Sequence, residues 1–377
     1  MANNKVKKYK VVHMTSAHGA FDDRIFHKEV KSLANTGYKV ALIAPHDKKE
    51  SIGNIEIVPI RKAKNRFERM TISTLKVLYL ALKEKADIYH FHDPELIPTG
   101  FIIKFLTGRK VIYDVHEDYK QKMLSYEWIN KRYRKFVSII LDMLEKKFST
   151  YFDYVITADS YVQSRFRRRK VEIIANYPPL SFSAGLECTR NNTTFKLIYV
   201  GGISEDRGIV MIIESLKYLK NKNINFEVFG NTDNPMLLNL LNNTEKVKYF
   251  GVVPWQEVSK HLANADVGLV LLQPVPAYFY CPGENIVKLF EYMSVGLPII
   301  ISNFPKLKKL ILDIGCGIPV DPTNPEEIAK AIEYLIEHPE EVKQMGENGR
   351  KAVLEKYNWE HEEKKLLRIY DELLNEN

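Results

Sequence analysis

The sequence predicts an α/β protein built from two doubly wound domains, each with a mostly parallel sheet covered by helices. Apolar strand segments alternate with helical segments, and the alternation starts again in the second half with "FKLIYVGG" at 195–202. The strand segments are almost continuously apolar, which is typical of parallel sheets buried on both faces. The length of 377 residues also exceeds one comfortable core and fits two.

The first half begins with an apolar strand at 9–16, "YKVVHMTS", and an amphipathic helix at 22–37 that ends in a glycine. A stretch rich in Pro, Ser, Asn and Thr at 176–194 is the best linker candidate. The other strands predicted in this half are 38–45, 55–60, 86–93, 109–117, 153–159 and 171–176, and the other helices are 66–85 and 122–150.

The second half repeats the architecture without repeating the sequence. Its predicted strands are 195–202, 224–230, 247–253, 266–272 and 297–302, and its predicted helices include 207–219, 255–265 and 288–296. Ligands of doubly wound sheets bind beyond the carboxyl ends of the strands. We therefore expect two domains that face a cleft, with ligands held by the loops that follow the strands.

Composition excludes several classes of protein. No run of 18 apolar residues is present, and the N-terminal "MANNKVKKYK" lacks the apolar centre of a signal peptide. We expect a cytoplasmic protein, at most peripheral at the inner face of the cell membrane. The three cysteines, Cys188, Cys281 and Cys316, are far apart and odd in number, so they predict neither a disulfide framework nor a cysteine zinc site.

The net charge of +8 is unevenly distributed. Residues 1–180 hold 34 Lys and Arg against 20 Asp and Glu, giving +14, and the remainder carries −6. Basic clusters lie at 61–69, 130–135 and 165–170. They are either solvated helix faces or a surface for anionic lipid or an anionic acceptor. Nucleic acid is not expected as a partner, because no recognised nucleic-acid motif accompanies these clusters.

Two stretches in the second half carry candidate ligand-binding residues, and the first of them has the shape of a phosphate-binding turn. In "YVGGISEDRGIV" (199–210) a strand is followed by two glycines and a helix, with Arg207 at the helix start. In "GENIVKLFEYMSVGLPIIIS" (283–302) we expect a helix that begins near Glu284–Ile286, which puts Glu284, Lys288 and Glu291 on one face. A tight turn and a solvated Glu–Lys face are the structural alternatives. The very apolar strand that follows favours a charged face that looks into a cleft.

Polar residues in the first half also have two interpretations. His90 and His92 share one face of a strand and, with Asp93, could chelate a metal. We favour the alternative, in which such residues at a strand end bind sugar hydroxyls. Asp22 and Asp23 precede a helix and predict N-capping. Arg24 in that first turn opposes the helix dipole, which suggests an anionic group on the acceptor.

These motifs together resemble one family. "KLFEYMSVGLPIIIS", "YVGGISEDRGI", "SAHGAFDDRIFHKEVKSLANTGYKVALIAP", "HFHDPEL", "YDVHEDY" and "NYPP" occur in the order found in retaining GT-B glycosyltransferases of the family-four class, polysaccharide-building branch. The resemblance implies an N-terminal acceptor-binding domain at 1–178, a linker at 179–194 and a nucleotide-sugar-binding domain at 195–356. It also implies a closing helix at 357–377 that packs back on the first domain.

The resemblance implies a transferase that moves a sugar from a nucleotide-diphosphate sugar, of UDP or GDP type, to a saccharide or lipid-linked acceptor, with no further cofactor and no metal. The implied catalytic residues are His116, Arg207, Lys288 and Glu291. The implied donor-binding residues are Gly201, Gly202, Arg207, Val252, Val253, Glu284, Asn285, Ile286, Lys288, Leu289 and Glu291. The implied acceptor-binding residues are His18, Gly19, Asp23, Arg24 and His92.

The chain departs from this family at two places. Gly202 stands where an arginine is usual, and the first of the family's two glutamates, eight positions before Glu291, is replaced by Gly283. Glu284 lies one residue late. These departures keep two alternatives open, a nucleotide-sugar 2-epimerase of the same fold and a catalytically silent partner subunit.

Overall fold

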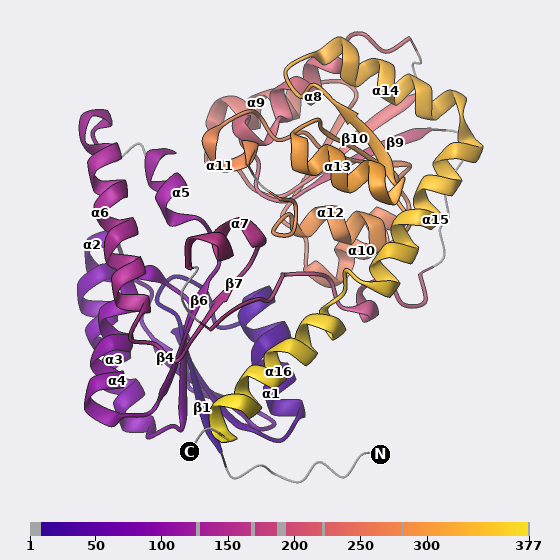
Figure 1. Cartoon of the computed structure of the whole chain (residues 1–377). Coiled ribbons are helices and arrows are strands. Elements are labelled where there is room, and N and C mark those ends of the chain that lie inside the picture. Colours follow the sequence, from indigo (N-terminus) through magenta and orange to yellow (C-terminus); the bar gives the residue numbers. More distant parts are fainter. Residues whose placement is uncertain are drawn as a thin grey trace. The chain divides into compact units, whose positions relative to one another are not determined.

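The computed structural model describes residues 9–125, 129–166, 170–186, 194–220, 223–280 and 282–375 (Figure 1). Cys188, Cys281 and the arginines at 167–169 lie outside this part. The chain divides into two compact units. The first consists of Met1–Asn176 with Glu362–Asn377, and the second of Tyr177–His361.

The first unit is built on an eight-stranded sheet in the order β3-β4-β2-β1-β5-β6-β7-β8, in which only β3 and β4 pair antiparallel. Without the edge strands β3 and β8, this is the doubly wound order 3-2-1-4-5-6. The strands are β1 (Lys10–Met14), β2 (Lys39–Pro45), β3 (Glu50–Ile52), β4 (Ile55–Ile60), β5 (Ile88–Phe91), β6 (Lys110–Val115), β7 (Tyr154–Thr157) and β8 (Val171–Ile173).

The helices of the first unit follow the strands in sequence. After β1 the chain forms a wide π-type helix, η1 (Asp23–Val30), that continues into α1 (Lys31–Asn35). Asp22 caps η1, because its carboxylate accepts from the backbone of Arg24 and Ile25, as predicted. The other helical segments are α2 (Arg66–Glu68), η2 (Arg69–Ser73), α3 (Thr74–Glu84), η3 (Pro94–Leu96), α4 (Ile97–Thr107), α5 (Tyr119–Ser125), α6 (Lys131–Ser149), α7 (Ser160–Gln163) and η4 (Ser164–Phe166).

The second unit is built on a six-stranded parallel sheet in the order β11-β10-β9-β12-β13-β14, again the order 3-2-1-4-5-6. Its strands are β9 (Phe195–Val200), β10 (Ile224–Phe229), β11 (Val247–Gly251), β12 (Val267–Val270), β13 (Ile299–Ser302) and β14 (Gly317–Val320). Its helical segments are η5 (Leu180–Phe182), η6 (Glu205–Arg207), α8 (Ile209–Ser215), α9 (Pro235–Asn243), α10 (Trp255–Ala263), α11 (Pro276–Phe279), α12 (Val287–Ser294), α13 (Pro305–Ile314), α14 (Pro325–Glu337) and α15 (Pro339–Glu355).

The last helix, α16 (Trp359–Asn375), contributes its residues from Glu362 onward to the first unit. There it buries Leu366, Ile369, Tyr370 and Leu373 completely. Tyr38, after α1, donates a hydrogen bond of 2.9 Å to Asp371. The Glu362 carboxylate accepts from the backbone nitrogen of Ala175 at 2.9 Å. Apolar burial and these polar contacts, which span 333 and 187 residues of sequence, attach the helix to the first unit.

Among the described residues, each sheet packs against an apolar core. The core consists of apolar side chains of the strands and of the helices that cover them. The fully buried strands β5, β7, β12 and β13 confirm the prediction of sheets covered on both faces. In the described part of the chain, no helix has both the length and the apolar composition required to cross a bilayer.

Candidate functional site

In the second unit the sheet order changes direction at β9, which pairs with β10 on one side and β12 on the other. The glycine turn follows β9 directly at this point. Gly201 has φ of +123°, and a Cβ atom there would lie 3.1 Å from Nζ of Lys288. A Cβ atom on Gly202 would lie 3.3 Å from Nη1 of Arg207. The two glycines therefore let the backbone approach both cations closely.

Lys288 carries the least compensated charge of this region. Its Nζ atom is buried and, among the described residues, has no hydrogen-bond partner. The ammonium lies 3.6 Å from the centroid of the Tyr199 ring, a cation–π contact that replaces only part of its hydration. Burial, and then Arg207, hold the pKa of Lys288 well below its ordinary value, while Glu291 raises it in part. An anion bound here would give the Lys288 ammonium the hydrogen-bond acceptor that no described residue supplies.

The structure corrects the expected position of Arg207. The α-helix after the turn begins at Ile209, and Gly208 precedes it with φ of +80°. Arg207 lies in the short helical turn before that glycine and donates to the Gly202 carbonyl at 3.4 Å. It is therefore outside the first turn of α8, whereas the sequence analysis placed it at the start of that helix. Its guanidinium still lies on the glycine turn beside Lys288.

The structure also corrects the start of the helix that holds Lys288 and Glu291. Helix α12 begins at Val287, so Glu284 and Asn285 lie in the turn before it. The sequence interpretation placed Glu284 on one helix face with Lys288 and Glu291. This was wrong, because Glu284 lies outside the helix. Lys288 and Glu291 remain on adjacent turns of α12. Of the other residues assigned to the donor, Ile286 and Leu289 are buried and pack the helix in place.

Gly283 explains why the family's first glutamate is missing here. Its φ is +94°, a left-handed conformation that favours glycine. A Cβ atom there would lie 3.0 Å from side-chain atoms of both Leu307 and Leu310 on α13. A glutamate at this position would need both a different backbone and a displaced leucine pair. The missing carboxylate is therefore part of how this turn folds.

Trp255 is a residue of this region that the sequence interpretation missed. Its indole Nε1 donates to Oε1 of Glu291 at 3.0 Å, and Glu291 is only 6% exposed. The Trp255 ring packs on Phe182, with centroids 4.9 Å apart. The only signal in the sequence was its place at the first position of α10, directly after the segment expected to line the nucleobase. Of that segment, Val252 is 74% exposed.

The first unit has its own change of direction, at β1, which pairs with β2 and β5. Here Asp93, two residues after the end of β5, fixes the loop that follows β1. Its Oδ2 accepts from Thr15 Oγ1 at 2.8 Å and from the Ser16 backbone nitrogen at 2.6 Å. His18 lies on this loop, 3.2 Å from Asp22 and 3.5 Å from Asp93. Burial alone would lower the pKa of His18, but these two carboxylates raise it above its ordinary value.

His116 lies near the same strand ends, 12% exposed at its side chain. Its Nε2 is 3.0 Å from Oδ2 of Asp114 and 3.1 Å from Nδ1 of His92. Burial would raise the pKa of Asp114, but Arg24 and His116 hold it well below its ordinary value. Asp114 is thus a buried anion that orients both histidines.

Arg24 and His92 were assigned to the acceptor, and the structure places both in the interior. The Arg24 guanidinium is 4% exposed and donates to both oxygens of Asp114 and to the Ile174 carbonyl. His92 is fully buried. This corrects the sequence interpretation, which had both side chains in direct contact with the acceptor. Neither side chain reaches the surface of the unit. The predicted acceptor residues His18, Gly19 and Asp23 are partly or fully exposed.

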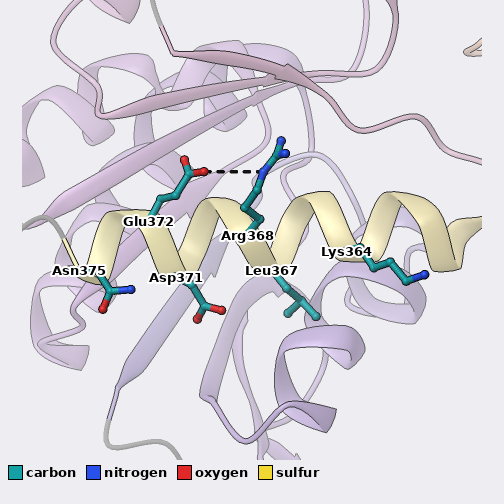
Figure 2. Close-up of a pocket in the computed structure, with 6 residues that line it drawn as sticks. All are labelled: Lys364, Leu367, Arg368, Asp371, Glu372 and Asn375. Atoms are coloured by element: carbon teal, nitrogen blue, oxygen red, sulfur yellow. Dashed lines mark ion pairs between the residues drawn. The ribbon is translucent and has the colours of Figure 1, made fainter.

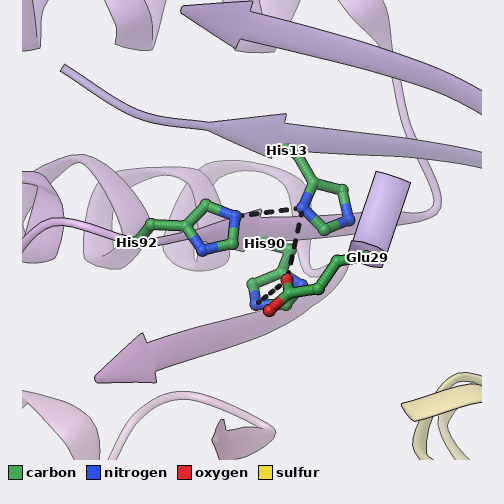
Figure 3. A group of neighbouring side chains, drawn as sticks. All are labelled: His13, Glu29, His90 and His92. Atoms are coloured by element: carbon green, nitrogen blue, oxygen red, sulfur yellow. Dashed lines mark hydrogen bonds and ion pairs between the residues drawn. The ribbon is translucent and has the colours of Figure 1, made fainter. Parts of the chain in front are cut away.

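Next to Asp114 lies a second, fully buried group of side chains, His13, Glu29, His90 and His92 (Figure 3). Their facing nitrogen and oxygen atoms all lie within 4.8 Å of one another. Burial lowers the pKa of His92 to about 4, although Asp114 opposes this. Burial and then Asp114 raise the pKa of Glu29. His90 was expected at the edge of a cleft, but it lies inside the unit.

A surface hollow of about 640 Å³ runs along α16 (Figure 2). Its lining residues are Lys364, Leu367, Arg368, Asp371, Glu372 and Asn375. Arg368 and Glu372 form an ion pair across one helical turn, 3.7 Å apart. None of the predicted site residues lines this hollow, so we do not assign the site to it.

Models of two families match the two halves of the chain. The model described as Glycosyltransferase Family 4 matches residues 23–177, and the model described as Glycosyl transferases group 1 matches residues 188–352. The chain is 28% identical over 179 residues to an uncharacterised glycosyltransferase of Methanocaldococcus jannaschii, which covers 46% of this chain and 44% of that protein. The chain thus spans less than half the length of this curated relative.

Solved structures resemble almost the whole chain. Sucrose-phosphate synthase from Thermosynechococcus elongatus has a TM-score of 0.78 at 16% identity, over 98% of this chain and 100% of that chain. Anabaena HepE, solved in complex with UDP-glucose, has a TM-score of 0.69 at 13% identity, over 97% and 100%. At these identities the likeness establishes the fold.

The two doubly wound sheets and the solved structures that they match define an α/β protein of the GT-B fold. Each half of the chain matches a glycosyltransferase model, of the family-four type at residues 23–177 and of the group 1 type at residues 188–352, which supports the family that the sequence resemblance implied. The roles of individual site residues stay predictions.

Restoring the missing glutamate is expected to destabilise the second unit. In Gly283→Glu the positive φ alone costs about 1–2 kcal/mol. This corresponds to a melting temperature lower by roughly 2–8 °C for a unit of this size. Gly251→Ala is the matched control, because Gly251 has φ of +71° with nothing within 4 Å of a Cβ atom, so it bears the backbone strain without the contact. Calorimetry that shows Gly283→Glu melting at the wild-type temperature would contradict this account of the turn.

Proposed function

We propose that this glycosyltransferase moves a hexose from a nucleoside-diphosphate sugar to a saccharide or lipid-linked acceptor, with retention, in the assembly of a bacterial surface polysaccharide or glycolipid. The observation that carries the proposal is the buried ammonium of Lys288 beside the glycine turn, for which no described residue is a hydrogen-bond acceptor. A diphosphate would supply the acceptor that Lys288 lacks. HepE, a structural neighbour, was solved with UDP-glucose, which supports a nucleotide sugar of the UDP type as the first donor to test.

The chemistry of the leaving group fits these residues. Cleavage of a glycosyl–phosphate bond leaves negative charge on the diphosphate. Lys288 and Arg207, held against the same turn by Gly201 and Gly202, would stabilise that charge without a metal ion. Glu291 would accept from the ribose hydroxyls in competition with, or in addition to, the Trp255 indole. For retention, we propose that the departing phosphate assists the acceptor hydroxyl on the same face of the sugar.

In the first unit, His116 is the residue proposed to contact the transferred sugar. Its ring is oriented by Asp114, so its free face is preorganised. His18, Gly19 and Asp23, on the loop after β1, are proposed to contact the acceptor. Arg24 would act on this site only through Asp114.

The basic first unit is proposed to dock on anionic lipid through its apolar face. Phe67, Leu75 and Tyr79 on α2 and α3 are 78%, 66% and 58% exposed, and Phe105 on α4 is 83% exposed. Exposed basic side chains accompany them, and Lys76 lies 5.5 Å from the Tyr79 ring. Aromatic and apolar side chains flanked by Lys and Arg are the composition of an interfacial membrane surface.

A catalytically silent subunit is the second candidate function. Two observations favour it, the glycine that replaces the first glutamate and the occupation of Glu291 by the Trp255 indole. Binding of nucleotides without transfer or hydrolysis of any nucleotide sugar would support it. Activity on a nucleotide sugar alone, with no acceptor sugar, would instead indicate an epimerase.

Removal of either cation is expected to weaken donor binding. Arg207→Ala and Lys288→Ala should each reduce affinity for a nucleoside diphosphate by about 1.5–3 kcal/mol, as for other hydrogen bonds to charged groups. Isothermal titration calorimetry with UDP and GDP measures this. Lys309→Ala, an exposed lysine paired with Asp313 on α13, is the control and should bind as the wild type does.

Lys288 should also make binding pH-dependent. Its pKa is lowered in the free protein, and a bound diphosphate would raise it, so binding takes up a proton in the pH range between the two values. Affinity should be greatest below the free-state pKa and fall as pH rises through it. Titration in Tris and in HEPES should give different enthalpies for the wild type and Arg207→Ala, but the same for Lys288→Ala. Unchanged affinity in both alanine variants would mean that the site is misplaced.

Glu291 should be the carboxylate of this region on which the reaction depends. Glu291→Gln keeps the oxygen that accepts from Trp255 but removes the charge, so it should lower turnover or donor affinity at least tenfold, about 1.4 kcal/mol. Glu284→Gln should change either value by less than about threefold, because Glu284 lies before α12. Steady-state kinetics with the donor found by a thermal-shift panel of nucleotide sugars would decide. If Glu284→Gln is the inactive variant, Glu284 replaces the missing glutamate.

Docking on lipid should need the apolar face as well as the charge. The double variant Phe67→Ser with Leu75→Ser should bind anionic vesicles at least tenfold more weakly, about 1.4 kcal/mol. Leu312→Ser, a leucine on α13 of the second unit that is 55% exposed, is the matched control. Binding of the wild type should fall with salt, because exposed charges are screened within about 8 Å at physiological ionic strength. Equal sedimentation with neutral and anionic vesicles, or with neither, would rule the surface out.

A further inference from the structure

The buried group His13, Glu29, His90 and His92 has no role in the function proposed above (Figure 3). All four side chains are 0% exposed. They come from β1, η1 and the end of β5, so the sheet and the first helix bring them together. His13 Nδ1 lies 3.0 Å from His92 Nε2, and Glu29 Oε2 lies 4.0 Å from both His13 Nδ1 and His90 Nε2.

We propose that these four side chains form a buried structural metal site that binds one zinc ion. Three imidazole nitrogens and one carboxylate oxygen are a ligand set that zinc prefers. In a tetrahedral site with bonds of about 2.0–2.1 Å, the ligand atoms are roughly 3.4 Å apart. The three separations given above lie on either side of that value, so small shifts of the side chains would suffice.

The second nitrogen of each histidine supports this assignment. The hydroxyl of Tyr370 lies 3.1 Å from Nε2 of His13 and 2.8 Å from Nδ1 of His90. Asp114 Oδ2 lies 3.3 Å from Nδ1 of His92. In metal sites the ring nitrogen that does not bind the ion is typically held by a carboxylate, hydroxyl or carbonyl in this way. Here all three histidines are held by their outer nitrogens, with their inner nitrogens directed at one another and at Glu29.

Some of the nitrogen and oxygen atoms that face the centre of the group make no hydrogen bond in the described part of the chain. Among the described residues, His90 Nε2 and both Glu29 oxygens make no hydrogen bond, although Glu29 Oε1 lies 3.0 Å from Nε of Arg24. A hydrogen-bonded network without a metal would pair His13 with His92 and Glu29 Oε1 with Arg24, but it would leave His90 Nε2 and Glu29 Oε2 unsatisfied, and buried unsatisfied polar atoms are costly. One ion would satisfy the inner atoms of all four side chains together.

The site would be structural, because complete burial leaves no access for a substrate. Tyr370 belongs to α16, so the ion would connect the C-terminal helix to β1 and β5 through the two histidines that this hydroxyl holds. It would not contact the residues proposed to bind the donor, which belong to the second unit. The inference therefore stands or fails separately from the proposed function.

Metal content of the full-length chain, purified without a histidine tag and without chelators, tests the inference. Mass spectrometry of the wild type after incubation with zinc and desalting should find about one zinc per chain. His90→Gln and Glu29→Gln should each retain at most a fifth of that. His46→Gln is the control and should keep the zinc, because His46 is paired with Glu50 outside the group. Cobalt in place of zinc should give the visible absorption of a tetrahedral site in the wild type and in His46→Gln.

Other outcomes would overturn the inference. A wild type that keeps less than a tenth of the zinc expected, or a His90→Gln variant that keeps all of it, would exclude the site. If the variants do not fold, X-ray absorption at the zinc edge of the wild type decides the ligands. Three imidazoles and one further oxygen support the proposal, and sulfur or fewer imidazoles contradict it.

Discussion

Parallel pairing of one central strand with two neighbours in each unit is the constraint on which both sites depend. The connection after β1 leads to β2 on one side, and the connection after β5 leads to β6 on the other side. β9 and β12 are related in the same way, so the loops after the two strands of each pair diverge. Backbone nitrogens and side chains at this point are not covered by the next helix of the sheet. The Asp93-bound loop in the first unit and the glycine turn in the second both lie there.

Within the first unit, Asp114 is the carboxylate that organises the polar interior. It accepts both arms of the Arg24 guanidinium and lies beside His92 and His116. A buried carboxylate is costly unless it is paired and hydrogen-bonded, and here a guanidinium supplies the pairing. From the sequence, Arg24 was expected to bind an anionic group of the acceptor. In the structure it neutralises the buried Asp114 carboxylate instead. In the proposed site Arg24 would be a positioning residue, since it holds the carboxylate that lies beside His116.

The sequence predicted the fold well, because periodicity and apolar strands report directly on sheets that are covered on both faces. It also located the glycine turn and the segment with Lys288 and Glu291. It failed where a side chain depends on distant partners. Alternation along a strand placed His90 and His92 on one face, but the tyrosine that covers His90 comes from 280 residues later. The start of α12 was misplaced because the backbone of Gly283 is left-handed, which the residue type permits but does not require.

The buried cations of the two units differ, because Arg24 is paired with a carboxylate and Lys288, among the described residues, is not. This difference fits the separate roles proposed for the two units. In the first unit the buried arginine and carboxylate are mutually paired, so His116 is held in one orientation before any substrate arrives. In the second unit Lys288 is desolvated, shifted toward its neutral form and left without an acceptor. Such a group gains most when a dianionic ligand enters, because binding both restores its charge and supplies the missing hydrogen bonds. The proposed reaction, in which a diphosphate departs, would use both features. The paired network in the first unit would orient His116, and Lys288 in the second unit would bind the diphosphate.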